Sequence, residues 1–572
     1  MVVLGAMLLS LPVFHAEPAL KDWLLDADPY PARILRTESG FALTNGLVTR
    51  QFARGTTTSI YNHASGEELL RAVGPEAVFV LDGKEVTVGG LEGQPDRAYL
   101  DVKWIPSLKP SPGSLEFKGA TVEEASLVLH YQGESLSADV AYTSYAGIPL
   151  LTKQVVLRND RSKPVRIDRF EVERLSLVES DSVVDPSPEW RKPNLTVLTD
   201  YSFGGMAVTN ANRTVYWEPE PEYTTQVNYE LKTPCRLSVR PPVGPGFELK
   251  PGESFSTFKV FELYHDSTDR ERQGLAVRRM YRTVAPWVAD NPIMLHLTST
   301  DPKVVHEAID QAADCGFEMV VISFWSGLDM EDVSPENLAK FKGFVDYAHS
   351  KGLRLGGYSL LASRHIDAEN DVVNPKPAFG ASPCLGSEWG RSYFEKVRTF
   401  LSETGFDLLE HDGSYPGDTC ASTSHPGHRG LEDSQWTQYQ TIADFYRWCR
   451  SRGIYLNVPD NYFLVGSNKT GMGYRETNWS LPREQQHIHA RQNLYDGTWE
   501  KTPSMGWMMV PLVEYQGGGP EATIEPLREH LDDYGMHLAN NFGYGAQACY
   551  RGPRLYDSPE TRTVVKKWVG WF

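Results

Sequence analysis

The chain has 572 residues, of which 41% are hydrophobic and 11% aromatic, a composition typical of a globular protein and a length too great for one hydrophobic core. Its 74 acidic and 56 basic residues give a net charge of −18, and no dense basic run is present, so the chain lacks the cationic surface that nucleic acid requires. We therefore expect two large domains and no nucleic-acid partner.

The first segment of the chain is short and apolar. Residues 2–14 are almost wholly apolar, and Val13-Phe-His-Ala16 supplies a small residue at a suitable cleavage point, although no Lys or Arg precedes it. This pattern predicts a signal peptide over residues 1–16 and a secreted or periplasmic protein. The segment is too short to span a membrane and no other long apolar run exists, so no membrane partner is expected.

Residues 17–285 are dominated by strand patterns. Alternating or β-branched runs such as Ser126-Leu-Val-Leu-His-Tyr131 and Thr152-Lys-Gln-Val-Val-Leu-Arg158 are interrupted at short intervals by Gly, Pro, Asn and Asp. Such spacing is typical of an all-β sandwich. The first long helical pattern, residues 269–282, is interpreted as a linker helix at the end of this N-terminal β-sandwich domain.

From residue 291 onward, strand and helix patterns alternate. A strand over 293–298 precedes a helix that Asp301-Pro302 opens, and an amphipathic helix follows a second, buried strand. The remaining strands are expected at residues 317–324, 353–361, 406–412, 454–459, 473–478, 505–512 and 542–549. Eight strands within about 280 residues predict a (β/α)8 TIM barrel over residues 291–572, the domain in which we expect any catalytic groups to lie.

One other fold and the end of the chain bear on this prediction. A doubly wound open sheet is the alternative fold, but no Gly-rich phosphate loop follows the first strand, so the barrel is favoured. Residues 559–572 form an amphipathic helix without a C-cap. From that ending we expect a C-terminal β domain to be absent or truncated.

Carboxylates stand at the ends of several predicted strands, where a β/α barrel carries its catalytic groups. The fourth strand, Phe406-Asp-Leu-Leu-Glu-His-Asp412, ends in Asp412, and Glu484 opens the helix after the sixth strand, seventy-two residues later. Glycosidases use two carboxylates that flank the scissile bond. The other acids so placed are Asp329, Glu410, Asp418, Asp460, Glu476 and Glu514, and the residues alone leave the choice of the pair open.

The motifs around these acids resemble those of the clan that holds the family 36 and family 27 α-galactosidases, with family 36 nearer because of the large N-terminal β domain. In that family a strand led by Phe-Asp ends in the nucleophile. Its acid/base stands seven residues before an Arg in a helix that closes with Tyr-Gly-Thr, and a Ser-x-Met-Gly strand follows. Here Phe406-Asp407 leads the strand that ends in Asp412, and Glu484 precedes Arg491, Tyr495-Asp-Gly-Thr498 and Pro503-Ser-Met-Gly506 in nearly the same register. The resemblance therefore implies that Asp412 is the nucleophile and Glu484 the acid/base, with Glu476 as the alternative to Glu484.

The resemblance implies a retaining exo-α-glycosidase that hydrolyses terminal α-galactosides or a related sugar by double displacement, with an oligosaccharide or glycoconjugate as substrate. An α-N-acetylgalactosaminidase, a transglycosidase and a catalytically inactive glycan-binding protein are the alternatives.

The sequence departs from the family pattern at three places that concern sugar specificity. Glu410 replaces the family's sugar-binding Lys, Phe324-Trp-Ser-Gly-Leu-Asp329 replaces its paired Asp motif, and Asn457-Val-Pro-Asp-Asn-Tyr462 stands where the family has Cys-Ser-Gly-Gly.

Aromatic, charged and cationic side chains at strand ends or in loops are the remaining candidates for substrate contact. They are Trp325, Tyr358, Tyr415, Glu410, Arg475, Glu476 and Arg551.

No metal or cofactor is expected, since no His-Glu-x-x-His or Cys-x-x-Cys motif occurs and His487 and His489 point to different helix faces. Cys384 and Cys420 both follow barrel strands, and for these two a disulfide and free buried thiols are both open.

Overall fold

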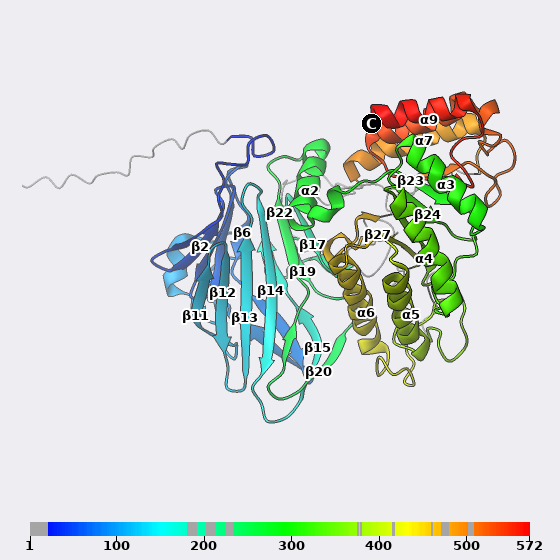
Figure 1. The fold of residues 1–572 in the computed structure, drawn as a ribbon. Coiled ribbons are helices and arrows are strands. Elements are labelled where there is room, and N and C mark those ends of the chain that lie inside the picture. Colours follow the sequence, from blue (N-terminus) through cyan, green and yellow to red (C-terminus); the bar gives the residue numbers. More distant parts are fainter. Residues whose placement is uncertain are drawn as a thin grey trace, which may run out of the picture.

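The structure is a computed structural model that describes residues 21–179, 192–201, 213–223, 233–373, 377, 380–413, 418–458, 461–470, 480–500 and 508–572. The predicted signal peptide, residues 1–16, lies outside the described residues. A broad N-terminal β region lies beside a second region of alternating strands and helices (Figure 1). Among the helices of the described ranges, none is both long and apolar enough to cross a membrane.

The strands of the N-terminal β region pair in antiparallel sheets. The largest has seven strands, β11 (Glu116–Glu123), β12 (Ser126–Gln132), β13 (Leu136–Ser144), β14 (Leu150–Asn159), β22 (Val260–Tyr264), β17 (Leu195–Thr199) and β21 (Ser254–Ser256). A five-stranded sheet contains β1 (Arg33–Arg36), β2 (Gly40–Thr44), β3 (Val48–Ala53), β4 (Thr56–Asn62) and β5 (Glu67–Glu68). One four-stranded sheet contains β20 (Pro245–Leu249), β15 (Val165–Glu171), β7 (Ala77–Leu81) and β8 (Lys84–Val88). The other contains β18 (Val215–Glu218), β19 (Arg236–Val239), β16 (Glu173–Leu177) and β6 (Leu70–Ala72). A short pair joins β10 (Lys109–Pro110) and β9 (Leu91–Glu92).

Alternating side chains explain why these segments are strands. In β13 every second residue, from Leu136 to Ser144, is buried, so one face of the strand packs into the core and the other does not. The strand character predicted for this region agrees with the structure. Because the described strands divide among five sheets, the two-sheet sandwich stays a prediction. Helix α2 (Arg270–Val284) begins after the Asp269 N-cap, where the linker helix was expected.

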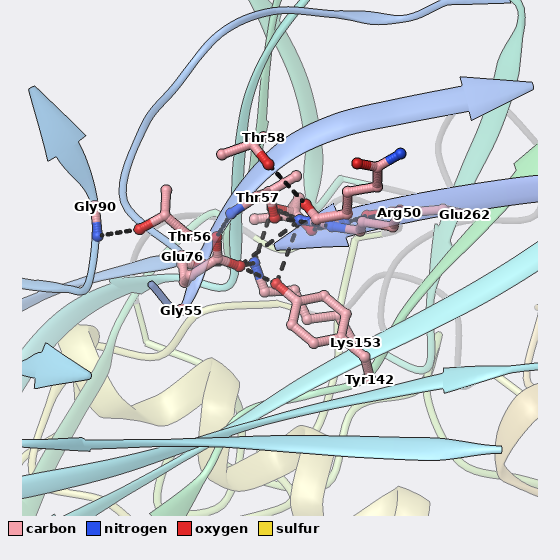
Figure 2. Close-up of polar contacts among 12 residues, drawn as sticks. Arg50, Gly55, Thr56, Thr57, Thr58, Glu76, Gly90, Tyr142, Lys153 and Glu262 are labelled. Atoms are coloured by element: carbon pink, nitrogen blue, oxygen red, sulfur yellow. Dashed lines mark hydrogen bonds and ion pairs between the residues drawn. The ribbon is translucent and has the colours of Figure 1, made fainter. Parts of the chain in front are cut away.

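A cluster of buried charged side chains lies inside the N-terminal β region (Figure 2). Arg50 of β3 is only 1% exposed and lies 3.0 Å from Glu173 of β16 and 3.2 Å from Glu262 of β22. Lys153 of β14 lies 2.8 Å from Glu173 and 3.6 Å from Glu76. Three carboxyl groups therefore face two cations, and the cluster is electrically balanced only when one carboxyl group carries a proton.

Glu262 is the carboxyl group that holds this proton. Burial, reinforced by repulsion from Glu173 and opposed by Arg50, raises the pKa of Glu262 to about 8. Burial also disfavours the charge on Glu173, but Arg50 and Lys153 outweigh it and lower the pKa of Glu173 to about 2. The hydroxyl of Tyr264 donates to Glu262 at 2.6 Å. Near neutral pH the cluster therefore pairs two carboxylates with two cations.

We expect the protein to lose stability as the pH rises from about 5 to about 8, because folded Glu262 keeps a proton that the unfolded side chain, with its ordinary pKa of 4.5, has released. Glu262→Gln keeps a neutral side chain of similar shape, so at pH 8 its unfolding midpoint should exceed that of the wild type. Thermal unfolding at both pH values measures this, with the exposed Glu123→Gln on β11 as control. A Glu262→Gln midpoint at or below wild type at pH 8 would contradict the assigned protonation.

The second region contains eight parallel strands in the spatial order β28-β27-β26-β25-β24-β23-β30-β29. Neighbours follow the chain order, and β30 pairs in parallel with β23, so the sheet curls back onto its first strand. This order fits a TIM-like barrel. The strands are β23 (Met294–Leu297), β24 (Met319–Ile322), β25 (Arg354–Leu360), β26 (Leu408–Asp412), β27 (Tyr455–Val458), β28 (Lys469–Thr470), β29 (Met508–Pro511) and β30 (Ala548–Gly552).

Helices connect these strands and cover the outside of the barrel (Figure 1). They are α3 (Pro302–Cys315), α4 (Pro335–Ser350), α5 (Glu388–Thr404), α6 (Leu431–Ser451), α7 (Arg483–Glu500), α8 (Leu531–Tyr544) and α9 (Pro559–Trp571). Asp301, Ser334, Ser387 and Ser558 cap α3, α4, α5 and α9 by accepting hydrogen bonds from the first backbone N–H groups.

Two predicted strands need comment. The range 473–478 lies outside the described residues, and the sixth strand, β28, is found just before it. The strand predicted over 542–549 was wrong in its first half, where Phe542–Tyr544 belong to α8. Tyr534, Leu538 and Phe542 recur four residues apart and are buried, and Gly545 ends the helix in the left-handed conformation with φ of 65°. The helical period was the stronger signal.

Helix α6 packs between the barrel and the N-terminal β region. The ring of Trp436, which is 5% exposed, stacks on Tyr201 with 5.7 Å between ring centroids, and also contacts Phe170 at 5.5 Å. The hydroxyl of Tyr439 donates to the backbone carbonyl of Asp200 at 2.7 Å. One face of this barrel helix is therefore buried by residues far earlier in the chain.

Candidate active site

Strand alternation places three side chains of β26 on one side. Successive residues of a strand point to opposite faces, so Leu408, Glu410 and Asp412 share a face and His411 points the other way. His411 is fully buried and contacts the Tyr393 hydroxyl of α5 at 2.9 Å and the Tyr446 hydroxyl of α6 at 2.8 Å. Burial, and then the nearby Arg364 cation, lowers the pKa of His411 to about 3. A neutral His411 therefore fixes β26 against two helices while the other face points into the barrel.

The lowest layer inside the barrel is apolar. Leu408 packs in one cluster with Met294, Met319, Val321 and Tyr455, which come from three other strands. Each of these five side chains is at most 1% exposed. Stacked layers of this kind fill a β/α barrel and close it from below, so that a ligand enters only from the carboxyl ends of the strands.

The next layer is polar and centred on Glu410. One carboxylate oxygen of Glu410 lies 2.8 Å from Nε2 of His296 on β23 and accepts a hydrogen bond of 2.9 Å from the side-chain amide of Asn457 on β27. Burial disfavours the charged imidazole ring, but the Cys549 sulfur and the Glu410 carboxylate outweigh it and raise the pKa of His296 to about 10. The negative charge that replaces the Lys of the similar family is therefore neutralised inside the barrel.

Asp412 lies above this layer, at the end of β26. The hydroxyl of Tyr358 on β25 donates to Oδ2 of Asp412 at 2.7 Å. The next residue, Gly413, has φ of 82°, and a Cβ atom there would lie 2.3 Å from the backbone nitrogen of Ala362. Only glycine lets the chain turn so closely past the loop that follows β25. Asp412 is thereby held at the strand end with one carboxylate oxygen bound to Tyr358.

A cavity of about 520 Å³ opens over these residues. Its floor includes Glu410, Asp412 and Tyr358, and its lining also includes Asp329 and Glu331 from the loop after β24. Its volume is within the range of small-molecule sites. Among the four acids of the lining, Glu410 is paired with His296, and Glu331 lies 2.6 Å from Arg364.

Three residues in the barrel have strained backbone, and all three line the cavity. Trp325, Ser363 and Gln516 have φ values of 59°, 59° and 23°, which side chains with a Cβ rarely adopt. Such conformations cost about 1–3 kcal/mol each and concentrate at functional sites. The other non-glycine residues with positive φ in the described ranges lie in the N-terminal β region. The strain therefore supports the cavity as the candidate functional site of the barrel.

Aromatic rings form one wall of the cavity. Phe324 contacts Trp325, Tyr358 and Tyr515 with ring centroids 5.7, 5.2 and 5.3 Å apart. Trp325 is 71% exposed at the rim, where its ring is available to a ligand. The Arg551 guanidinium lies 4.4 Å from the Phe324 ring and 4.7 Å from the Tyr515 ring and donates to the Phe324 carbonyl. Arg551 thus supports this wall from behind and is not among the residues that line the cavity.

The structure brings together Asp412, Glu410, Tyr358 and Trp325 of the predicted site. Glu484 lies in the first turn of α7, is exposed, and is not among the cavity-lining residues. Tyr415, Arg475 and Glu476 lie outside the described residues. The described residues that could together hold a metal ion, Cys384, Cys420, His425 and His428, also lie away from the cavity lining.

Several site residues were missed from the sequence. His296 and Asn457 are single polar residues in otherwise apolar barrel strands. A polar residue inside such a buried strand is the signal that could have identified them. Tyr515 and the Glu331–Arg364 pair lie in loops, where no periodic pattern marks a residue as facing the cavity. Their placement depends on the path of the loops.

Comparison with known proteins gives a match at the level of the fold. No protein-family model matches the chain, and no curated protein matches it. The chain is similar to the galactosidase domain of an α-galactosidase–sucrose kinase (TM-score 0.57, 11% identity, covering 94% of this chain and 86% of that one). It is also similar to a GH36 α-galactosidase from Geobacillus stearothermophilus (0.57, 12%, 94% and 86%) and to the α-galactosidase from Lactobacillus brevis (0.55, 12%, 95% and 83%). Over nearly its whole length, this chain therefore has a fold like that of the GH36 α-galactosidases.

Proposed function

We propose that the protein is a retaining exo-α-glycosidase that hydrolyses terminal α-galactosides or a related sugar such as an α-N-acetylgalactosaminide. The observation that carries this proposal is Asp412, a carboxylate at the end of the fourth barrel strand that lines a cavity of about 520 Å³ and is oriented by Tyr358. Carboxylates at strand ends of this barrel type are its usual catalytic groups.

The chemistry is a double displacement. A carboxylate oxygen of Asp412 bonds to the anomeric carbon while the glycosidic C–O bond breaks, and Glu484 gives its proton to the leaving oxygen. Glu484 then removes a proton from water, and the water oxygen replaces Asp412 on the sugar, which restores both groups. The Tyr358 hydroxyl donates to Oδ2 of Asp412, and the backbone N–H of Gly413 donates to Oδ1 at 2.7 Å, so hydrogen bonds orient both carboxylate oxygens.

Two structural neighbours support a sugar in the cavity. Variants of a GH36 α-galactosidase from Geobacillus stearothermophilus were solved in complex with stachyose (TM-score 0.56, 12% identity) and with 1-deoxygalactonojirimycin (0.53, 13%). In this chain Trp325 and the aromatic wall supply apolar surface, while Asp329 and Glu331 supply acceptors for sugar hydroxyls. Because Glu410 is already paired with His296, it adds no free charge toward the sugar.

Glu484→Gln is expected to lower kcat/KM about 10²–10⁴-fold on substrates with poor leaving groups and to change kcat/KM little on a dinitrophenyl glycoside, whose leaving oxygen needs no proton. Arg483, next to Glu484 in the first turn of α7, donates to the backbone carbonyls of Pro520 and Thr523 in the loop after β29, and Tyr515 of the same loop lines the cavity. Rates on a series of aryl glycosides measure this dependence. Asp329→Asn is the comparison, because Asp329 is an exposed acid that lines the cavity. If Asp329→Asn and not Glu484→Gln shows the dependence, Glu484 is not the acid.

One experiment tests the proposal as a whole. Nitrophenyl α- and β-glycosides of several sugars are supplied to the purified protein, and proton NMR identifies the first anomer released. A retaining α-glycosidase releases the α-anomer first, and an added acceptor sugar that captures the glycosyl group identifies a transglycosidase. A first product of inverted configuration, or binding of the sugar without turnover of any glycoside, would overturn the proposal.

A further inference from the structure

Four side chains that can bind a metal ion meet between two loops on the cavity side of the barrel. Cys384 lies in the loop after β25, and Cys420, His425 and His428 lie in the loop after β26. All four are buried, and their ligand atoms lie within 4.8 Å of one another. None of them lines the cavity, so this cluster is separate from the candidate active site.

Three of the six distances between the ligand atoms are close to those around a tetrahedral ion. Nδ1 of His425 lies 3.3 Å from Nε2 of His428, Sγ of Cys384 lies 3.2 Å from Nε2 of His428, and Sγ of Cys420 lies 3.5 Å from Nδ1 of His425. A tetrahedral zinc ion about 2.3 Å from sulfur and about 2.0–2.1 Å from nitrogen keeps its ligand atoms about 3.3–3.8 Å apart.

The surrounding backbone orients the cluster as a ligand set. Nε2 of His425 lies 2.9 Å from the backbone carbonyl oxygen of Glu369. A carbonyl oxygen can only accept a hydrogen bond, so Nε2 carries the proton and donates it. Nδ1 of His425 therefore keeps its lone pair and points it at the other three ligand atoms. The backbone N–H of Val373 donates to Sγ of Cys420 at 3.4 Å, as expected for a sulfur that carries negative charge.

We propose that Cys384, Cys420, His425 and His428 bind one zinc ion. Binding releases the two thiol protons, and the two thiolates balance the 2+ charge while both imidazoles stay neutral, so the buried site is uncharged overall. Tetrahedral S₂N₂ coordination is typical of zinc. Because the protein supplies four ligands, no position is left for water or substrate, and the ion is structural. This proposal replaces the expectation of no metal, which rested on the absence of His-Glu-x-x-His and Cys-x-x-Cys motifs and on the different faces of His487 and His489.

The zinc ion would fasten the loops that build one side of the cavity. The Ser387 hydroxyl donates to the Cys384 carbonyl at 2.7 Å and accepts from the backbone of Gly390, so the ligand loop leads directly into α5. On the first turn of α5, the Trp389 indole donates to Glu331, which lines the cavity, at 3.3 Å. The ion therefore acts on the cavity through the position of α5.

The two loops are in tight contact at a pair of glycines. The backbone N–H of Gly427 donates to the Gly386 carbonyl at 2.8 Å. A Cβ atom at Gly386 would lie 2.7 Å from Cδ2 of the His428 ring, closer than side chains approach. Gly386→Ala should therefore displace His428 and weaken zinc binding without removing a ligand.

Elemental analysis of the full-length protein after gel filtration tests the site directly. We expect about one zinc per chain in the wild type, a loss of most of it in Cys420→Ser and His425→Ala, and an intermediate content in Gly386→Ala. Cys315→Ala, which removes a buried thiol at the end of α3, is the matched control and should keep its zinc. Wild-type protein without stoichiometric metal after growth in zinc, or with a different metal at one per chain, would overturn the proposal.

A second measurement does not depend on the folding of variants. Wild-type protein reconstituted with cobalt in place of zinc should show thiolate-to-metal charge-transfer absorption, which a site without cysteine ligands lacks. Thiol titration of denatured, chelator-treated wild type should find all six cysteines, since the structure has each of them as a free thiol. Finding only four would indicate a Cys384–Cys420 disulfide and refute the zinc site.

Discussion

Asp412→Gly is expected to lower kcat on a nitrophenyl α-galactoside by about 10⁴-fold or more, as removal of a nucleophile does in other enzymes. The cavity that glycine opens at the end of β26 admits azide, which can attack the anomeric carbon in place of the carboxylate. Azide should therefore restore part of the rate and give a glycosyl azide of inverted, β configuration. Product analysis by NMR, with and without azide, makes the measurement.

The control for this variant is Asp346→Asn, an exposed acid on α4 that should keep wild-type activity. Should Asp412→Gly fail to fold, a 2-fluoro glycosyl fluoride can trap the covalent intermediate on the wild-type protein. Peptide mass spectrometry should then find the sugar on Asp412. Label on another carboxylate, or an Asp412→Gly variant with more than a tenth of the wild-type rate, would show that Asp412 is not the nucleophile.

Glu410→Gln is expected to lower the free energy of unfolding by about 3–5 kcal/mol near neutral pH, because it removes the carboxylate that pairs with the buried His296 ring. Denaturant unfolding measures the loss. His296→Asn removes the cation from the same pair, and the double variant restores a neutral polar layer. The double variant should therefore be less destabilised than the sum of the two single variants. Additive effects would mean that the two groups do not interact.

The same pair makes a prediction about pH. The folded pKa of His296, about 10, is raised above the ordinary value of 6.5, so its contribution is fully present below pH 6.5 and is lost as the pH rises toward 10. For a buried group this amounts to roughly 5 kcal/mol at most. In Glu410→Gln the unfolding free energy should vary less between about pH 6.5 and pH 9.5 than in the wild type. An unchanged slope would contradict the charge assigned to His296.

The barrel could be predicted because its strands are short buried runs separated by amphipathic helices, a pattern that each segment carries by itself. Asp412 could be predicted for a related reason, since it is the last residue of such a run. The error at residues 542–549 arose where apolar residues at helical spacing continued into Gly-rich sequence. There the helix and strand patterns overlap, and the burial of Phe542 on α8 decided the outcome.

The interactions of Glu410 could not be predicted from local pattern. Asn457 lies 47 residues away but pairs in register with Glu410 on the neighbouring strand, whereas His296 lies 114 residues away on the first barrel strand and meets Glu410 only because the sheet curls. From the sequence, Glu410 was interpreted as an inverted charge beside the sugar, whereas in the structure it forms a balanced pair with His296. The same holds for Cys384 and His428, which meet across 44 residues.

The burial of α6 has a consequence for how this protein can be divided. Trp436 and Tyr439, on the helix that follows the strand of Asp412, are covered by Tyr201, Phe170 and the carbonyl of Asp200. A barrel excised at residue 290 would expose this tryptophan and this tyrosine to solvent. We therefore expect the barrel to need the N-terminal β region for its stability, and an exchange with another barrel to require that α6 and the residues covering it are exchanged together.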